Sequence, residues 1–490
     1  MNKLKILFAS SEVTPFAKTG GLADVSGSLP PALASLGHQV AVVMPLYRST
    51  KEGKHELKQH EKNLSVPFKG QPLSTKVFLA SVGSDIPVYF IQRDEFFDRS
   101  GLYGTPDGDY IDNPERFIFF SRSILELSKL IGYQPDIIHC HDWQTSLVPV
   151  YLKSTYRDAS YLKKARSVFT IHNLAYQGVF PKETMSVSEL SPELFSIKGL
   201  EYYGKMNFMK GGILFSEIIT TVSERYAKEI QTPEYGYGLD GVLIDRSKDI
   251  FGILNGADYG SWNPKTDTHI AANFDVKDLS GKQRCKEELS KIFNLQGTDK
   301  SPVIGLISRL ADQKGFDILA EAMENLLKLD LCLVILGTGD AKYEKQYAAL
   351  GKKHPGYLGV KIAFDNALAH KIEAGADMFL MPSKYEPCGL NQMYSLKYGT
   401  IPIVRATGGL DDTIKEFNPE TGKGNGFRFT PYSSVELIKA VKRARYLYRN
   451  NRLWTKLVEN AMKEDFSWQK SARKYEEVYQ KALAKEENPA

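Results

Sequence analysis

The hydrophobic positions of the chain fall into short apolar runs separated by segments with helical spacing. Runs typical of buried strands lie at 6–9, 40–44, 87–91, 135–140 and 167–171, then at 303–307, 331–336, 378–381 and 401–404. After the first run, Leu22, Val25, Leu29, Leu33 and Leu36 recur at spacings of three and four, which predicts a helix. Strands that alternate with helices predict an α/β fold of two Rossmann-like, doubly wound lobes, which we expect to face a deep cleft.

The lobes are separated by a segment rich in Gly, Asn and Asp at about 251–264. We expect the first lobe at residues 1–252 and the second at 253–465. Residues 57–82 alternate without a helical pattern and predict a β excursion from the first lobe. The tail from 466 to 490 predicts a helix that packs back on the first lobe.

Composition excludes several classes of protein. The net charge of +5 is small for 490 residues, and no basic block with interleaved aromatics occurs, so nucleic-acid binding is disfavoured. Apolar stretches are too short to span a membrane. The four cysteines are scattered without metal-type spacing, which suits a reducing compartment, and we expect a soluble cytoplasmic protein.

Two similar glycine turns follow strands in the two halves. The first contains Lys18, Gly20 and Gly21, and the second contains Thr407, Gly408 and Gly409. Both turns have the sequence Thr-Gly-Gly-Leu. Glycine lets a ligand approach the backbone, and the free N–H groups of a first helical turn attract anions. A plain tight turn is the alternative at either place, but the repetition favours backbone donors for one phosphorylated ligand.

Charged side chains cluster after strands of the second half. Arg309 and Lys314 flank one strand-to-helix turn, and together they suit a pyrophosphate leaving group. A solvated loop is the alternative. Glu386 precedes another helix start, where it could accept sugar hydroxyls or merely cap the helix. Cys388, two residues later, is interpreted as a packed or ligand-lining thiol rather than a nucleophile.

Histidines mark two strand ends of the first half. His139 and His141 alternate along a strand and are followed by Asp142, which admits a metal site, but no third ligand converges in the sequence. A polar strand end lining a ligand site is the preferred interpretation. His172 occupies the same position after the next strand, where a structural role is the alternative.

Together these motifs resemble the bacterial glycogen synthase and plant starch synthase family, retaining glucosyltransferases with two Rossmann lobes (the GT-B type). The resemblance covers nearly the whole chain. It is carried by the motifs at 18–24, 141–143, 172–178, 255–256, 309–315, 386–390 and 407–410.

The resemblance implies transfer of glucose from ADP-glucose to the non-reducing 4-OH of an α-1,4-glucan such as glycogen, with no cofactor and no metal. The first lobe would hold the acceptor and the second the nucleotide sugar. The residues implied in catalysis are Asp24, His172, Arg309, Lys314 and Glu386. Those implied in donor binding are Lys18, Gly20, Gly21, Asn255, Arg309, Lys314, Phe364 (against the adenine), Cys388, Gly389, Leu390, Asn391, Thr407, Gly408 and Gly409. Those implied on the acceptor side are Tyr103, Asp142, Trp143 and Asn173.

Three alternatives remain open from the sequence. A transferase of the same fold could use UDP-glucose or another acceptor, because few contacts select the base. A phosphorylase is disfavoured because no lysine signature for a pyridoxal cofactor is present. A non-catalytic glucan-binding relative is disfavoured by the intact charged motifs. The sequence leaves the oligomeric state open.

Overall fold

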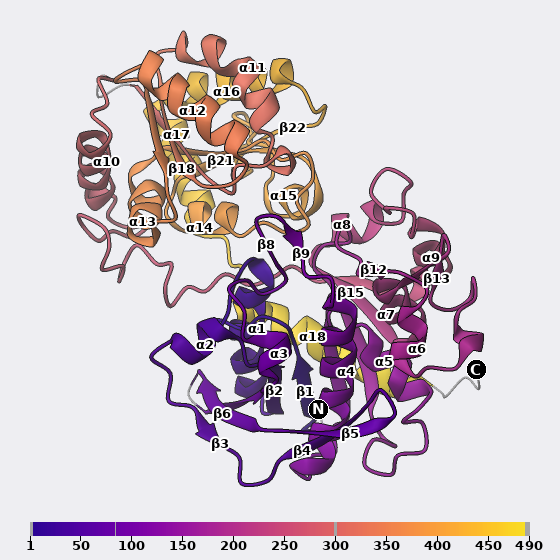
Figure 1. Ribbon diagram of the computed structural model, residues 1–490. Helices are drawn as coiled ribbons and strands as arrows, with labels where there is room; N and C mark the ends of the chain where they lie inside the picture. The colour runs from indigo at the N-terminus through magenta and orange to yellow at the C-terminus, as the bar shows by residue number, and fades with distance from the viewer. Residues whose placement is uncertain (1–2, 84, 298–300, 486–490) are drawn as a thin grey trace. The chain divides into compact units, whose positions relative to one another are not determined.

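The computed structural model describes residues 3–83, 85–297 and 301–485. The chain forms two compact units, Met1–Gly256 with Trp468–Ala490, and Ala257–Ser467. The boundaries expected from the sequence, at 252 and 465, fall a few residues before these junctions. In Figure 1 the first unit runs from indigo to magenta and includes the yellow C-terminal helix.

The first unit is built on a mixed sheet that, within the described residues, has nine strands in the order β16-β15-β11-β10-β1-β2-β7-β6-β3. The strands from β16 to β7 are parallel, and β6 and β3 extend the sheet in antiparallel fashion. The strands are β1 (Lys5–Ala9), β2 (Gln39–Pro45), β3 (Lys58–Gln59), β6 (Val77–Val82), β7 (Ile86–Ile91), β10 (Ile137–His141), β11 (Arg166–Ile171), β15 (Ile218–Thr221) and β16 (Ile250–Gly252).

Helices of the first unit cover this sheet, which is why its central strands are buried along almost their whole length. Strand β10, for example, is buried at every position. The helices are α1 (Gly21–Ser35), α2 (Arg48–Glu52), α3 (Asp94–Phe97), α4 (Asn113–Leu130), α5 (Leu147–Lys153), α6 (Thr184–Ser188), α7 (Phe208–Phe215), α8 (Glu224–Glu229), α9 (Asp240–Asp245) and α18 (Trp468–Ala484), with 3₁₀ turns at Pro192–Leu194 and Ser247–Asp249.

The C-terminal helix α18 is separated in sequence from the rest of its unit, yet it packs against α1, β11 and β15. Its buried side chains recur with helical spacing, as at Trp468, Tyr475 and Tyr479. Figure 1 shows it, in yellow, among the indigo and magenta elements.

In the part of the first unit that the structure describes, three small sheets stand apart from the main one. The β excursion expected at 57–82 is present, because β4 (Leu64–Phe68) and β5 (Gln71–Thr75) form a hairpin between β3 and β6. A second pair is β8 (Gly104–Thr105) with β9 (Gly108–Asp109). A third sheet, β12-β14-β13, follows the His172 loop in the chain. Its strands are β12 (Val179–Phe180), β13 (Glu201–Tyr202) and β14 (Lys205–Asn207).

The second unit has, within the described residues, a six-stranded, fully parallel sheet in the order β19-β18-β17-β20-β21-β22. Its strands are β17 (Val303–Ile307), β18 (Cys332–Gly337), β19 (Leu358–Ile362), β20 (Met378–Met381), β21 (Ile401–Arg405) and β22 (Phe427–Phe429). Its helices are α10 (Ser280–Ile292), α11 (Phe316–Leu327), α12 (Ala341–Lys353), α13 (Asn366–Gly375), α14 (Asn391–Lys397), α15 (Gly408–Thr413), α16 (Ser434–Tyr448) and α17 (Asn451–Met462), with a 3₁₀ turn at Asp312–Lys314.

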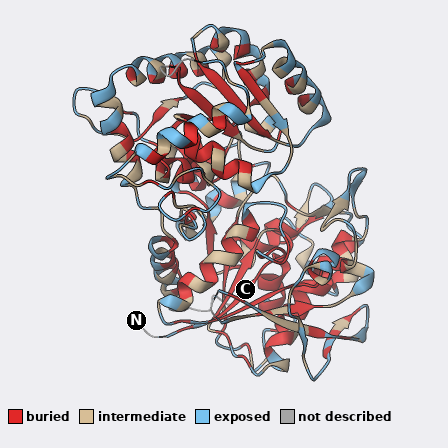
Figure 2. Ribbon diagram, turned by 90° about the vertical axis from the view of Figure 1, so that its left-hand side faces the viewer, coloured by how far each residue is buried: buried red, intermediate tan, exposed pale blue. Residues whose placement is uncertain are grey.

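The main sheet of each unit lies within the core of that unit, as the red strands of Figure 2 show. In the second unit, Leu333 and Ile335 of β18 pack in one cluster with Leu319 of α11 and Val441 of α16. The alternating strands and helices of both units confirm the α/β, parallel-sheet fold expected from the sequence. In such sheets the loops after the strands carry the ligand-binding groups.

Candidate active site

The loop after β1 is organised by Glu12, a buried carboxylate that the sequence analysis did not select. Its Oε2 accepts the backbone N–H groups of Thr19 at 2.5 Å and Gly20 at 3.3 Å, and its Oε1 accepts the Thr19 hydroxyl at 2.6 Å. The glycine turn is therefore closed on a carboxylate of the same loop. The place of Glu12 just after a strand end was the signal that could have identified it.

The glycine pair of this loop borders open space. A methyl group added at Gly20 or at Gly21 would meet no atom within 4 Å. Beside the pair, Lys18 Nζ forms an ion pair with Asp24 Oδ1 at 2.7 Å, and both side chains are partly exposed. The structure thus places Asp24 beside Lys18, Gly20 and Gly21, three of the residues expected to bind the donor.

The ends of β10 and β11 meet through the side chains of His141, Asp142 and His172. His141 Nδ1 lies 2.9 Å from His172 Nε2, and Asp142 Oδ1 accepts the backbone N–H of His172 at 2.7 Å. Asp142 has a φ of 54°, a left-handed conformation that Asp tolerates better than most residues. This tight turn brings the polar residues of two neighbouring strands into one cluster.

Burial shifts the pKa of all three titratable groups of this cluster toward their neutral forms, and lowers that of His141. It raises the pKa of Asp142 to about 7, although the N–H groups of His172 and Asn173 act in the opposite direction. It lowers the pKa of His172 to about 3, so the imidazole is neutral at physiological pH. A neutral His172 can donate or accept a hydrogen bond but carries no charge.

Two aromatic side chains expected on the acceptor side are fixed beside this cluster. The ring of Tyr103 lies 6.4 Å from that of Trp143, and its hydroxyl donates to Glu12 Oε1 at 2.8 Å. Trp143 is buried, and a methyl group at Gly178, whose φ is +63°, would come within 2.6 Å of the indole. Gly178 of the His172 loop is therefore needed for that loop to pack on Trp143.

Two asparagines complete the candidates of the first unit. Asn173 Oδ1 accepts the N–H of Ala175 at 3.1 Å, which stabilises the turn after β11. Asn255 is 5% exposed, and its Oδ1 has no hydrogen-bond partner among the described residues. The next residue, Gly256, lies against Trp468.

In the second unit Lys314 and Glu386 form an ion pair. Lys314 Nζ lies 2.6 Å from Glu386 Oε2, with side-chain exposures of 20% and 7%. Ser383, which the sequence analysis did not single out, donates its hydroxyl to the same oxygen at 3.1 Å. Gly315 has a φ of +77°, and a methyl group there would lie 2.1 Å from the carbonyl oxygen of Pro382. The glycine thus lets the loop after β17 approach the loop after β20.

Arg309 also follows β17, but its side chain is exposed. Across residues 3–83, 85–297 and 301–485, no hydrogen bond or ion pair engages its guanidinium. An always charged donor group is therefore left available to an anionic ligand.

The second glycine turn packs against the Glu386 loop. Gly409 N–H donates to the carbonyl oxygens of Glu386 and Pro387 at 3.1 and 3.2 Å. A methyl group at Gly408, whose φ is +45°, would lie 1.9 Å from the Glu386 oxygen, and one at Gly409 would lie 2.1 Å from that of Cys388. The glycines here permit a close approach of two backbone segments, and the Gly409 N–H is used within the protein.

The remaining candidates of the second unit differ in exposure. Cys388 and Thr407 are buried, whereas Phe364, in the loop after β19, is 89% exposed. Gly389 has a φ of +73° and is followed by Leu390, at the start of α14. Asn391 donates a hydrogen bond from Nδ2 to the carbonyl oxygen of Ile307 at 2.8 Å. This bond joins α14 to β17.

The pair of histidines on β10 does not have the surroundings of a metal site. His139 Nε2 lies 2.6 Å from the Thr170 hydroxyl, and its Nδ1 lies 2.9 Å from the hydroxyl of Tyr479 on α18. Both of its ring nitrogens are thus engaged by protein groups. In the part of the chain that the structure describes, no group of three or more His, Cys, Asp or Glu side chains could hold a metal ion.

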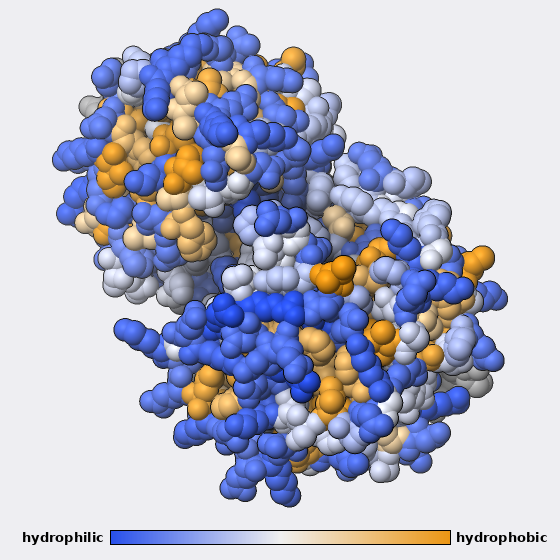
Figure 3. Space-filling model, in the orientation of Figure 1, coloured by the Kyte–Doolittle hydropathy of each residue, from blue (hydrophilic) through white to orange (hydrophobic). Residues whose placement is uncertain are grey.

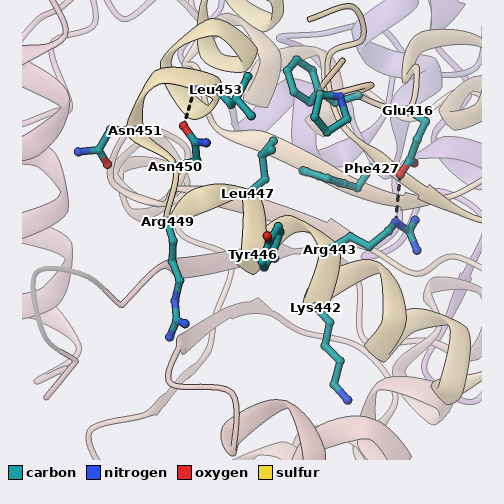
Figure 4. Close-up of a pocket in the computed structure, with 12 residues that line it drawn as sticks. Glu416, Phe427, Lys442, Arg443, Tyr446, Leu447, Arg449, Asn450, Asn451 and Leu453 are labelled. Carbon is teal, nitrogen blue, oxygen red and sulfur yellow. Dashed lines mark hydrogen bonds and ion pairs between the residues drawn. The ribbon is translucent and has the colours of Figure 1, made fainter. Parts of the chain in front are cut away.

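A surface groove of about 1040 Å³ in the second unit contains none of the expected site residues. It lies beside α16 and the start of α17, and its lining includes the buried Phe427 and Leu447 and the exposed Tyr446 and Arg449 (Figure 4). The surface seen in Figure 3 is mostly hydrophilic, with hydrophobic side chains in small patches. No helix in the described residues is long and apolar enough to cross a bilayer.

Comparison with known proteins adds independent information. Residues 5–245 match the starch synthase catalytic domain family, and residues 288–464 match glycosyl transferases group 1. The chain is 48% identical to the glycogen synthase of Geotalea daltonii, with 98% of this chain and 99% of that protein covered. It matches the catalytic domain of starch synthase IV from Arabidopsis thaliana, bound to ADP and acarbose, with a TM-score of 0.90 and 36% identity over 99% of this chain and 100% of that one.

These matches confirm the resemblance carried by the sequence motifs, and the structural match confirms the fold class of two Rossmann-like lobes. A glycogen synthase from Koribacter versatilis aligns over 479 residues, which is 98% of each chain. The two sequences are 50% identical, and at that level of likeness the present chain belongs to the glycogen synthase family of retaining glycosyltransferases.

Proposed function

We propose that this chain transfers glucose from ADP-glucose to the non-reducing 4-OH of an α-1,4-glucan, with retention of configuration. The similarity to glycogen synthases and to an ADP-bound starch synthase supports this reaction. Within the chain, the observation that carries it is the cationic end of β17. There Lys314 is held by the buried Glu386, while Arg309 is left available.

The charges suit the bond that breaks. Departure of ADP develops negative charge on the diphosphate and positive charge on the sugar ring. Arg309 and Lys314 would stabilise the diphosphate, an electrostatic contribution that is usually the largest in catalysis. Because these cations are present in the protein, we propose that the reaction needs no metal ion. Transfer activity should then be unchanged by EDTA.

Retention could follow from two inversions or from attack on the face that the diphosphate leaves. Two inversions need a carboxylate free to attack the anomeric carbon. Glu386 is paired with Lys314 and Asp24 with Lys18, so neither is poised as a nucleophile. We therefore favour attack from the leaving-group face, with the departing phosphate accepting the proton of the acceptor hydroxyl. His172, Asp24 and Glu386 would position and polarise the sugar.

The remaining roles follow from exposure and contacts. Gly20 and Gly21 border open space in which a phosphorylated ligand can approach the backbone, with Lys18 beside it. Phe364 offers an exposed ring for the adenine. Asn255 offers a side-chain oxygen that has no hydrogen-bond partner among the described residues.

Two groups of residues complete this assignment. Gly389, Leu390 and Asn391 would line the donor site together with Cys388, and Thr407–Gly409 would support the loop of Glu386. Tyr103, Asp142, Trp143 and Asn173 form the proposed acceptor side.

A donor competition tests the proposal. Purified chain is given glycogen with radiolabelled ADP-glucose or UDP-glucose, and label in the polymer is counted. Preferential transfer from ADP-glucose supports the proposal, and preference for UDP-glucose assigns the alternative donor. No transfer from either, despite glycogen binding, would indicate a non-catalytic glucan-binding relative.

Substitution of Glu386 tests the assignment of the site. Glu386→Ala should lower kcat much more than it raises the KM for the donor, because the carboxylate acts in the transition state. A loss confined to KM would reduce Glu386 to a binding residue.

A further inference from the structure

A histidine that the proposed reaction does not use directly lies behind His172. His141 is fully buried and packs against two rings, with centroid distances of 4.2 Å to Phe8 and 4.1 Å to His139. Its Nδ1 lies 2.9 Å from His172 Nε2. The ring is therefore held by packing against two neighbouring rings and contacts His172 with one edge.

A hydrogen bond between the two imidazoles requires a proton on one of the two nitrogens that face each other. Burial lowers the pKa of both His141 and His172, so both rings are neutral at physiological pH. In a neutral imidazole one nitrogen is a donor and the other an acceptor. Either His141 donates from Nδ1 to His172, or His172 donates from Nε2 to His141, and each choice fixes both tautomers.

The surroundings of His141 distinguish these two arrangements. Its Nε2 is buried and has no hydrogen-bond partner among the described residues. The neighbouring His139 cannot accept from it, because both nitrogens of that ring are occupied by Thr170 and Tyr479. A proton on His141 Nε2 would be an orphaned buried N–H, which folded proteins avoid. The proton is better placed on Nδ1, where it has an acceptor.

We propose that His141 is a positioning residue that donates from Nδ1 to His172 Nε2 and thereby keeps the proton of His172 on Nδ1. The Nδ1 of His172 has no partner within the described residues, and it becomes an oriented donor for an oxygen of the bound sugar. This inference rests on the proposed role of His172 in the glucosyl transfer.

The tautomer can be read without any reaction. In protein labelled with ¹⁵N-histidine, two-bond ¹H–¹⁵N correlations separate the two neutral tautomers, and His141→Asn and His172→Asn variants assign the signals. We expect His172 to be protonated on Nδ1 and His141 likewise. A wild-type His172 protonated on Nε2 would overturn the proposal.

Two variants of similar size test the consequence for activity. Asn can place an amide donor near the position of Nδ1, whereas Leu has a similar shape and no donor. His141→Leu should lower kcat about tenfold, the effect of one lost hydrogen bond, while the donor KM changes little. His141→Asn should keep most of the wild-type kcat. Equal losses in the two variants, or none in either, would contradict the proposal.

The two readouts separate failure of this inference from failure of the proposed function. If the wild-type chain transfers no glucose, the proposed function fails while the tautomer is still measured. If it transfers glucose and the two variants behave alike, only the role of His141 fails. Thermal unfolding of both variants checks that the comparison is made on folded protein.

Discussion

Lys314 Nζ lies 2.6 Å from Glu386 Oε2, so a lysine suited to the departing diphosphate is held in the free chain by a nearly buried carboxylate. The pair joins the loops after β17 and β20, and Ser383 donates to the same oxygen. A diphosphate bound as proposed would share the lysine charge with Glu386.

Removal of one partner of this pair should destabilise the chain. Among the described residues, Lys314→Met leaves the Glu386 carboxylate with the Ser383 hydroxyl alone, and we expect a loss of about 1–3 kcal/mol in the free energy of unfolding. The double variant Lys314→Met/Glu386→Gln should recover part of that loss, because no unpaired charge remains. Urea unfolding of the wild type, both single variants and the double variant measures the coupling. Additive losses would show that the two side chains do not interact.

The two glycine turns should respond differently to alanine. At Gly20 and Gly21 a methyl group meets nothing, so the free energy of unfolding should stay within about 0.5 kcal/mol of wild type. The kcat/KM for ADP-glucose should nevertheless fall at least about tenfold, because the methyl group would occupy space proposed for the diphosphate. Full activity of both variants would exclude a ligand at this turn.

Gly408→Ala is the matched counterpart. Its methyl group would lie 1.9 Å from the carbonyl oxygen of Glu386, in a residue with a φ of +45°. We expect a loss of about 1–3 kcal/mol in the free energy of unfolding and lower kcat, since the Glu386 loop must shift. The same urea titration measures it, and a stability equal to that of Gly20→Ala would contradict the close packing.

Acid should destabilise the first unit through its buried histidines. Burial lowers the pKa of His139, His141 and His172, so the folded chain stays neutral there while the unfolded chain binds protons below about pH 6.5. The free energy of unfolding should therefore fall with decreasing pH, by about 1.4 kcal/mol per pH unit for each fully neutral histidine.

Replacing one buried histidine tests this slope. His139→Asn should flatten the dependence on pH between 5 and 6 by roughly that amount, as measured by urea unfolding at each pH. His269→Asn is the control, because that side chain is exposed. Equal slopes in the wild type and His139→Asn would contradict the prediction.

Asp142 should produce the opposite dependence. Burial raises its pKa to about 7, so between about pH 4 and 7 the folded chain keeps a proton that the unfolded chain has released. Its contribution to stability is present at low pH and is lost as the pH rises through 7. Asp142→Asn, which can still accept the His172 N–H, should gain stability relative to wild type as the pH increases from 5 to 8. Parallel curves for the two proteins would be inconsistent with a proton held at Asp142.

Much of the fold could be predicted because many of the central strands are continuous apolar runs. The runs at 303–307 and 378–381 became strands with those bounds, and β15 (Ile218–Thr221) was missed because two threonines interrupt its apolar pattern. The β12-β14-β13 sheet was also missed, because strands of two or three residues carry no readable period.

The candidate site was predictable where a residue follows a strand end, and less so where its role depends on what packs against it. His141 and His172 meet because β10 and β11 are adjacent and parallel. Two glycine turns with the same Thr-Gly-Gly-Leu sequence have different surroundings, one open and one packed on the Glu386 loop. Glu12 was overlooked because its partners, Thr19 and Gly20, are set by the path of a loop rather than by periodicity.

Helix α18 has a consequence for how the molecule is made. It supplies the hydroxyl of Tyr479 to His139 and covers β11 and β15, yet more than 200 residues separate it from the rest of its unit. During translation, one surface of the first sheet therefore stays uncovered until the whole second unit has been synthesised. Nascent chains stalled before residue 468 should therefore remain substrates for chaperones and proteases.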